Sequence, residues 1–143
     1  MKLRTFYIFK IKNDFYNLYL NNSKNLYTLL TQLYYLKRDS INYGFSLFNQ
    51  LTESIDKDKL DRKIFIKYHK NMIYSKNGND HIINNLYKNE VSILRIKKAY
   101  LLIESNNNYS TFFKIINELG NNYFICDFIN QDYFWINDIK MLV

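Results

Sequence analysis

Residues 5–11, TFYIFKI, form a short run of aromatic and β-branched side chains bounded by charge. Such side chains suit the pleated surface of a sheet, so the run predicts a β-strand. The pattern then becomes helical over 14–21, within the stretch NDFYNLYLNN at 13–22. Asn13 stands where an N-cap is expected, and Asp14 suits the positive end of the helix dipole. We therefore expect a strand that leads directly into a short helix.

This short helix carries more apolar surface than one contact can cover. At about 100° per residue, Phe15, Leu18 and Tyr19 lie on one side of it. Tyr16 and Leu20 lie on a different face. Two apolar stripes on one short helix cannot both meet the same sheet. The next helix covers the spare stripe, or the stripe is available to a partner, and the residues alone leave both possibilities open.

Three further segments have the spacing of amphipathic helices. The clearest is 23–38, where leucines recur every three or four residues behind Ser23, the expected capping residue. A second is expected to begin at Ser40. The third, 109–119, is followed by a glycine, a residue type common just after a helix.

Extended patterns predict the other elements. The segment 91–104 divides into two apolar runs around a pair of lysines, as an antiparallel hairpin does. The runs 122–129 and 132–137 flank a short polar turn and predict a second pair of strands. Together these elements predict an α+β fold in which helices pack on a mostly antiparallel β-sheet, as a single domain over 1–143.

Residues 57–90 fit more than one pattern. The charge-rich run 57–62 is expected to be a solvated link. The alternation in KIFIKYH at 63–69 favours a strand, although a longer run that ends at Tyr74 also fits a helix. SKNGND at 75–80 is expected to be a turn or loop, and HIINNLY at 81–87 to form one or two helical turns.

The formal net charge of +7 and the sequence pI near 9.3 raise the possibility of a nucleic-acid partner. Asn, Ile, Lys and Tyr are all abundant and have A/T-rich codons, so an A/T-rich genome accounts for many lysines without a dedicated basic surface. Basic and aromatic residues mix at 62–76, but no glycine-aromatic nucleic-acid signature accompanies them. A basic nucleic-acid-binding protein without a protein partner is therefore the alternative function.

The sequence shows no catalytic or metal-binding motif. His69 and His81 are the only histidines, and neither has partners at a recognised metal-ligand spacing. The only cysteine, Cys126, lies in an apolar run, as a buried inert thiol does. Asp127 beside it is expected either to be hydrogen-bonded or to lie on the outward phase of a strand. We expect no enzyme, no cofactor and no small-molecule substrate.

No apolar run approaches the roughly 18 residues needed to cross a bilayer. Charged residues interrupt the N-terminal segment where a signal peptide would be apolar. The expected location is the cytoplasm, without a membrane partner.

Both ends of the chain carry a recognisable pattern. In RTFYIFKIKNDFYNLYL, an aromatic strand leads through a lysine into Asp14, Phe15 and Tyr19. In FICDFINQDYFWIN, an Asp-Phe strand and a short turn precede an aromatic-Trp-aliphatic-Asn strand. These features resemble the sporulation inhibitor of replication family, SirA, of low-G/C Gram-positive bacteria. Two positions depart from the family pattern: Asp138 replaces a proline, and Tyr16 replaces a small residue.

The resemblance implies a negative regulator of replication that is not an enzyme. Members of this family bind the N-terminal domain of the initiator DnaA and stop its productive assembly at the origin. In that family the aromatics of the first helix belong to the binding face. This places Phe15 and Tyr19, with Leu18 and Tyr16 beside them, at the partner-binding site. No direct contact with nucleic acid is expected.

Overall fold

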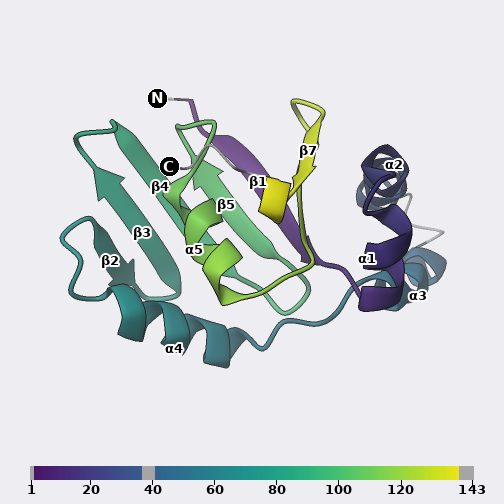
Figure 1. The fold of residues 1–143 in the computed structure, drawn as a ribbon, viewed down its shortest axis with the longest axis horizontal. Helices are drawn as coiled ribbons and strands as arrows, with labels where there is room; N and C mark the ends of the chain where they lie inside the picture. The colour runs from purple at the N-terminus through teal and green to yellow at the C-terminus, as the bar shows by residue number, and fades with distance from the viewer. Residues whose placement is uncertain (1, 37–40, 139–143) are drawn as a thin grey trace.

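The computed structural model describes residues 2–36 and 41–138, which form a β-sheet and a set of helices packed around it (Figure 1). The strands are β1 (Arg4–Lys10), β2 (Tyr74–Asn77), β3 (Asp80–Asn85), β4 (Glu90–Ile96), β5 (Leu101–Ser105), β6 (Tyr123–Asp127) and β7 (Asp132–Trp135). The helices are α1 (Asn13–Tyr19), α2 (Ser23–Tyr34), α3 (Ile41–Leu51), α4 (Lys57–Tyr68) and α5 (Thr111–Leu119), with a short 3-10 turn, η2 (Ile136–Asp138). The α+β class predicted from the sequence is confirmed.

The first strand of the chain lies inside the sheet. In the described part of the chain the strand order is β2-β3-β4-β5-β1-β6-β7, and all neighbouring strands are antiparallel. Tyr7 of β1 lies opposite Leu102 of β5 on one side and Cys126 of β6 on the other. Strand β1, from the start of the chain, therefore pairs with β5 and β6, which come much later in the sequence.

The alternation of β1 builds a separate core on each face of the sheet. Phe6 and Ile8 are fully buried on one face, where the ring of Phe6 meets Phe113 of α5 edge-on at 5.0 Å. Phe9 and Ile11 are buried on the other face in a second core that includes Leu26 and Leu30 of α2. Helices α4 and α5 contribute to the first core, and α2 and α3 contribute to the second.

Most of the expected elements are confirmed: β1, the β4–β5 hairpin, the β6–β7 pair, and helices in the positions of α1, α2, α3 and α5. The predicted caps of the first two helices are wrong. Asn13 and Ser23 lie inside their helices, and Lys12 and Asn22 occupy the cap positions without a side-chain capping bond. Gly120 is the C-cap of α5, as predicted, with an extended rather than a left-handed backbone. Ser40 and residues 37–38 lie outside the described residues.

The expectations for residues 57–87 are largely wrong. The supposed link and strand form one helix, α4, because the Asp56 side chain accepts a hydrogen bond from the Lys59 backbone at 3.2 Å and so caps it. Leu60, Ile64 and Tyr68 recur every four residues and pack on the first core, whereas Ile66, which a strand would place on the same face, is 62% exposed, as expected for a helix. The turn expected within 75–80 is confirmed at 78–79, where it joins β2 to β3, although the rest of that segment is strand; residues 81–85 are part of β3 rather than helical.

Helix α5 begins at a buried carboxylate that the sequence pattern did not indicate. The Ser110 side chain accepts from the Phe112 backbone at 3.2 Å and caps the helix. Glu90 of β4 accepts from the backbone and side chain of Thr111, at 2.9 and 2.6 Å. A buried negative charge at this position is favoured by the helix dipole and satisfied by these donors.

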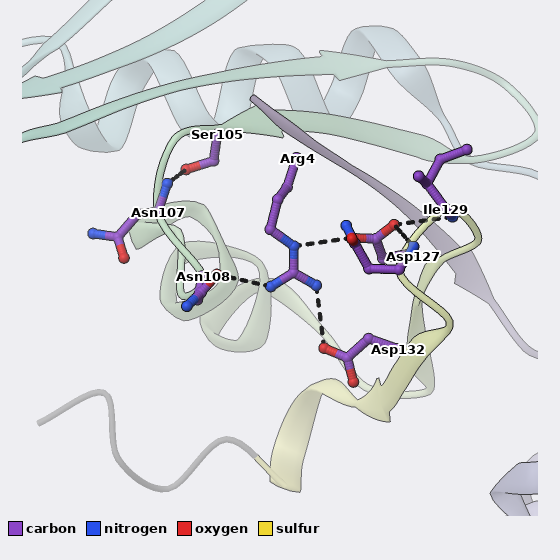
Figure 2. A network of polar contacts seen from close by, with 8 residues as sticks. Arg4, Ser105, Asn107, Asn108, Asp127, Ile129 and Asp132 are labelled. Atoms are coloured by element: carbon purple, nitrogen blue, oxygen red, sulfur yellow. Dashed lines mark hydrogen bonds and ion pairs between the residues drawn. The ribbon is translucent and has the colours of Figure 1, made fainter. Parts of the chain in front are cut away.

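A polar network joins the start of β1 to the β6–β7 turn (Figure 2). Arg4 donates from Nε to Asp127 at 2.9 Å, from Nη1 to Asn108 at 3.0 Å and from Nη2 to Asp132 at 3.2 Å. Asp127, only 1% exposed, also accepts from the backbone and side chain of Asn130. Burial alone would raise the pKa of Asp127, but the bonds from Asn130 and Arg4 hold it below its ordinary value. Of the two expectations for Asp127, the hydrogen-bonded one is confirmed.

We expect Arg4→Met to lower the free energy of unfolding by about 1.5–3 kcal/mol, because it removes a charged donor from a buried carboxylate. Denaturant unfolding followed by the fluorescence of the buried Trp135 measures the change. Lys2→Met is the matched control, because it removes a nearby exposed cation. Equal losses in both variants would show that the Arg4 network does not stabilise the fold.

Candidate protein-binding surface

The start of α1 is held in place by the strand before it and by the end of α3. Ile11 donates its backbone N–H to Asn122 O at 2.9 Å, and Lys12 donates its own to Leu51 O at 3.1 Å. The Lys12 ammonium also donates to Asn49 O at 2.8 Å. The helix therefore starts at a position fixed by both the sheet and α3.

None of the side chains on α1 is buried, and they differ in how far they are covered. Phe15, Tyr16 and Tyr19 are half-buried against the second core. Leu18 is 64% exposed, and Leu20, just after the helix, is 39% exposed. The structure thus brings the four predicted site residues together on one short helix, with Leu18 as the most exposed of them.

Tyr16 supports the surface rather than projecting from it. Its ring meets Trp135 of β7 edge-on at 4.8 Å. Its hydroxyl accepts a hydrogen bond from Asn137 Nδ2 at 3.4 Å. These contacts give a physical reason for a large residue at this position: it joins α1 to the C-terminal end of the sheet.

Helix α2 packs behind α1 and covers part of the spare apolar stripe. Leu26 and Leu30 are buried in the second core against which Phe15 and Tyr19 pack. Tyr27 stacks on Tyr133 of β7, with ring centroids 4.5 Å apart. Both possibilities left open by the sequence hold in part, because the second core covers part of the rings of Phe15, Tyr16 and Tyr19, while Leu18 lies at the surface.

A polar hollow lies at the α3 end of this surface and was missed by the sequence reasoning. It has a volume of about 490 Å³ and is lined by Lys12, Asn49, Thr52, Glu53 and Ser54. Lys12 precedes α1, whereas the other four residues come from the end of α3 and the segment after it. The sequence holds no signal for this juxtaposition, because it arises from the antiparallel bridge between Ile11 and Thr52.

A scan against known protein families matches residues 4–140 of the 143-residue chain to the family described as sporulation inhibitor of replication protein SirA. The chain belongs to the SirA family. The match covers the chain from the start of β1 through η2 and confirms the resemblance seen at the two ends. A search of curated proteins found no match for the sequence.

This SirA family member has a second, more apolar hollow of about 380 Å³ between α2, α3 and the sheet. Its walls include Leu33, Tyr34, Phe45, Phe48 and Tyr100. Gly44 belongs to its lining, and a Cβ there would collide with the Leu36 side chain, so the glycine permits α3 to approach the end of α2. The α1 residues Phe15, Leu18 and Tyr19 do not line this hollow.

In this SirA family member, a row of hydrogen-bonded titratable groups connects α4 to the β2–β3 hairpin. Tyr74 and His81 Nδ1 are hydrogen-bonded at 2.7 Å, and His81 Nε2 lies 2.6 Å from Asp61. Lys57 donates to the same carboxylate at 2.7 Å. His81 is fully buried, so a substrate has no access to its ring. These hydrogen bonds connect α4 to the β2–β3 hairpin.

Burial lowers the pKa of His81 below its ordinary value, against the opposing effect of Asp61. Burial alone would raise the pKa of Asp61, but hydrogen bonds from Lys57 and His81 hold it below its usual range. Burial also raises the pKa of Tyr74 to about 12. The neutral imidazole and the ionised carboxylate are therefore the forms that the fold stabilises.

We expect this SirA domain to lose stability as the pH falls below about 6.5, because the unfolded chain then takes up a proton that folded His81 resists. His81→Gln should flatten the pH dependence between about pH 6.5 and 5, while the loss at lower pH due to Asp127 stays. Denaturant midpoints measured across this range test the prediction. His69→Gln is the matched control, because His69 lies at the surface. Equal flattening in both variants would contradict the role given to His81.

Among the residues described, no three or more His, Cys, Asp or Glu side chains form a group able to hold a metal ion. Within the same residues, no helix combines the length and the apolar character that crossing a bilayer requires. Cys126 is buried, as predicted, and burial raises the pKa of its thiol well above its ordinary value.

Proposed function

We propose that this SirA family member inhibits the initiation of replication by binding the N-terminal domain of the initiator DnaA through α1, which blocks DnaA assembly at the origin. In this proposal residues 1–143 act as a single SirA-like domain. The observation that carries it is the exposure of Leu18, 64%, between the half-buried rings of Phe15 and Tyr19. Family membership supports the inhibitory role.

The half-buried state of Phe15 and Tyr19 favours binding. Interface anchors lose affinity when their side chains must first be ordered, at about 0.5–1.5 kcal/mol for each flexible group. Packing against the second core already orders these two rings and leaves part of each surface free. The backbone beneath them is ordered as well, through the bonds of Lys12 to α3. The helix thus presents a preorganised apolar stripe.

The polar hollow beside α1 fits the expected rim of such an interface. Protein interfaces combine an apolar centre with a polar border that carries hydrogen bonds. Lys12 and Glu53 supply charges of both signs next to the stripe, and Asn49 and Ser54 supply neutral polar groups. We propose that these residues contribute to partner specificity, together with Tyr16, through its contact with Trp135.

We expect Leu18→Ala to weaken binding to the N-terminal domain of DnaA by about 1–3 kcal/mol, because an exposed leucine becomes buried only in the complex. The free energy of unfolding should change by less than about 0.5 kcal/mol, as for other surface substitutions. Isothermal titration gives the affinity, and denaturant unfolding gives the stability. Leu86→Ala is the matched control, since Leu86 is 88% exposed and lies between β3 and β4.

The wild-type titration is itself decisive. A standard interface with aromatic anchors should bind at micromolar concentrations or below. No detectable complex at tens of micromolar, or equal affinities of the Leu18→Ala and Leu86→Ala variants, would contradict the proposal.

Phe15→Ala and Tyr19→Ala should lower both affinity and stability, unlike Leu18→Ala. Each ring is half-buried in the second core, so its removal is expected to destabilise the fold by about 1–2 kcal/mol, less than for a fully buried ring. The loss of binding should be larger, up to about 4 kcal/mol, for an interface anchor. Affinity measured on variants shown to be folded by circular dichroism separates the two effects. A loss of stability with unchanged affinity would assign both rings to the core alone.

A further inference from the structure

The positive charge of the chain is concentrated in one segment. Residues 57–76 contain six lysines and one arginine against two aspartates, so this segment carries a formal +5 of the +7 of the whole chain. It comprises α4, the turn after it and the first part of β2. In Figure 1, α4 lies below β2, β3 and β4, whereas α1, α2 and α3 lie at the other end of the long axis. An A/T-rich genome accounts for lysines in general but not for this clustering.

The helical geometry places these cations on one side of α4. Ile64 is buried in the first core, so the residues half a turn away from it point to solvent. Lys59 and Arg62 lie on that outer side and Lys63 on its flank, about 100° from Ile64; all three are exposed, as is Asp58, one turn before Arg62. The three cations occupy little more than one turn, about 6 Å along the helix axis. The result is a compact surface on which positive charge exceeds the single negative charge of Asp58.

This surface is not neutralised within the described residues. Lys57 and Lys67 are engaged, the first with Asp61 at 2.7 Å and the second with Glu118 at 2.9 Å. Lys59, Arg62 and Lys63 form no ion pair there. Three neighbouring cations without partners favour a polyanion.

The apolar residues of α4 argue against an anionic membrane as that polyanion. A helix that lies on a membrane needs a broad apolar face to bury among the lipids. Here Leu60, Ile64 and Tyr68 face the core, which leaves only Phe65, 43% exposed, and Ile66, 62% exposed, at the surface of the helix. Contact with a phosphate backbone requires cations alone.

We propose that the outer face of α4 contacts the phosphate backbone of duplex DNA without reading its sequence. This contact goes beyond the proposed binding of DnaA and does not rest on it. It departs from the expectation that the chain makes no direct contact with nucleic acid. Because α4 and α1 lie on different parts of the molecule, the protein can hold DNA and a protein partner at the same time.

The test is binding of the full chain to a fluorescein-labelled 30-base-pair duplex, followed by anisotropy between 50 and 200 mM KCl. The logarithm of the affinity should fall linearly with the logarithm of the salt concentration, with a slope of about −0.9 for each phosphate neutralised. The triple variant K59Q/R62Q/K63Q should reduce the slope by about 2.7 and weaken binding at 50 mM by at least about tenfold. The matched control K24Q/K88Q/K97Q removes the same charge from exposed positions elsewhere and should keep most of the affinity.

Three outcomes would overturn the proposal. Equal losses in the two triple variants would show that net charge alone is responsible. An absence of duplex binding at 50 mM would exclude the contact. Sedimentation with vesicles containing 30% phosphatidylglycerol, without binding to DNA, would assign α4 to a membrane surface.

Circular dichroism confirms that each variant is folded, and the single variants Arg62→Gln and Lys63→Gln repeat the comparison one charge at a time. Leu18→Ala should keep its affinity for the duplex, which separates this proposal from that of the α1 surface.

Discussion

The alternation of side chains along β1 is the constraint on which the remainder of the structure depends. Phe6 and Ile8 fill one core, and Phe9 and Ile11 fill the other. A slip of one residue in the pairing of β1 would exchange the two sets and expose both cores to the wrong helices. Pairing on both sides, with β5 and with β6, opposes such a slip. Arg4 adds a polar constraint at the first residue of the strand, through the buried Asp127.

The same strand determines where the proposed binding surface lies. Only Ile11 and Lys12 separate β1 from α1, and both are bonded to other parts of the fold. The sheet therefore determines the position of α1, because the link between β1 and α1 is short and hydrogen-bonded. The distant contact of Tyr16 with Trp135 fixes the orientation of the helix, because Trp135 belongs to β7, which pairs with β6 beside β1. A short helix without a buried residue of its own becomes a defined surface by this route.

The strands and helices with a single clear period were predictable from the sequence, and those with competing patterns were not. The β4–β5 hairpin and α5 each follow one period over their whole length. In α4, charged residues separate Leu60 from Ile64, and apolar and basic residues follow Ile64. A short segment such as 63–69 therefore resembles an alternating strand. For the proposed site, the sequence placed its residues on one short helix but did not give their exposure. The coverage of Phe15 and Tyr19 depends on α2 and on the second core, which combine segments far apart in the chain.

The amino-acid composition gives the number of cations, but the fold decides which of them are balanced by neighbouring carboxylates. Arg95 lies between Asp80 and Glu104, at 2.9 and 2.8 Å, so a cation on the middle strands of the sheet is balanced by its cross-strand neighbours. Register provides this balance, because Asp80 is opposite Arg95 in the β3–β4 pair. In a helix the balancing charge must come from a residue three or four positions away, and α4 has carboxylates only at Asp58 and Asp61, the second of which pairs with Lys57. The positive electrostatic potential of this lysine-rich chain is therefore expected at α4 rather than on the middle strands of the sheet. In Figure 1, α4 lies away from α1 and its aromatic stripe.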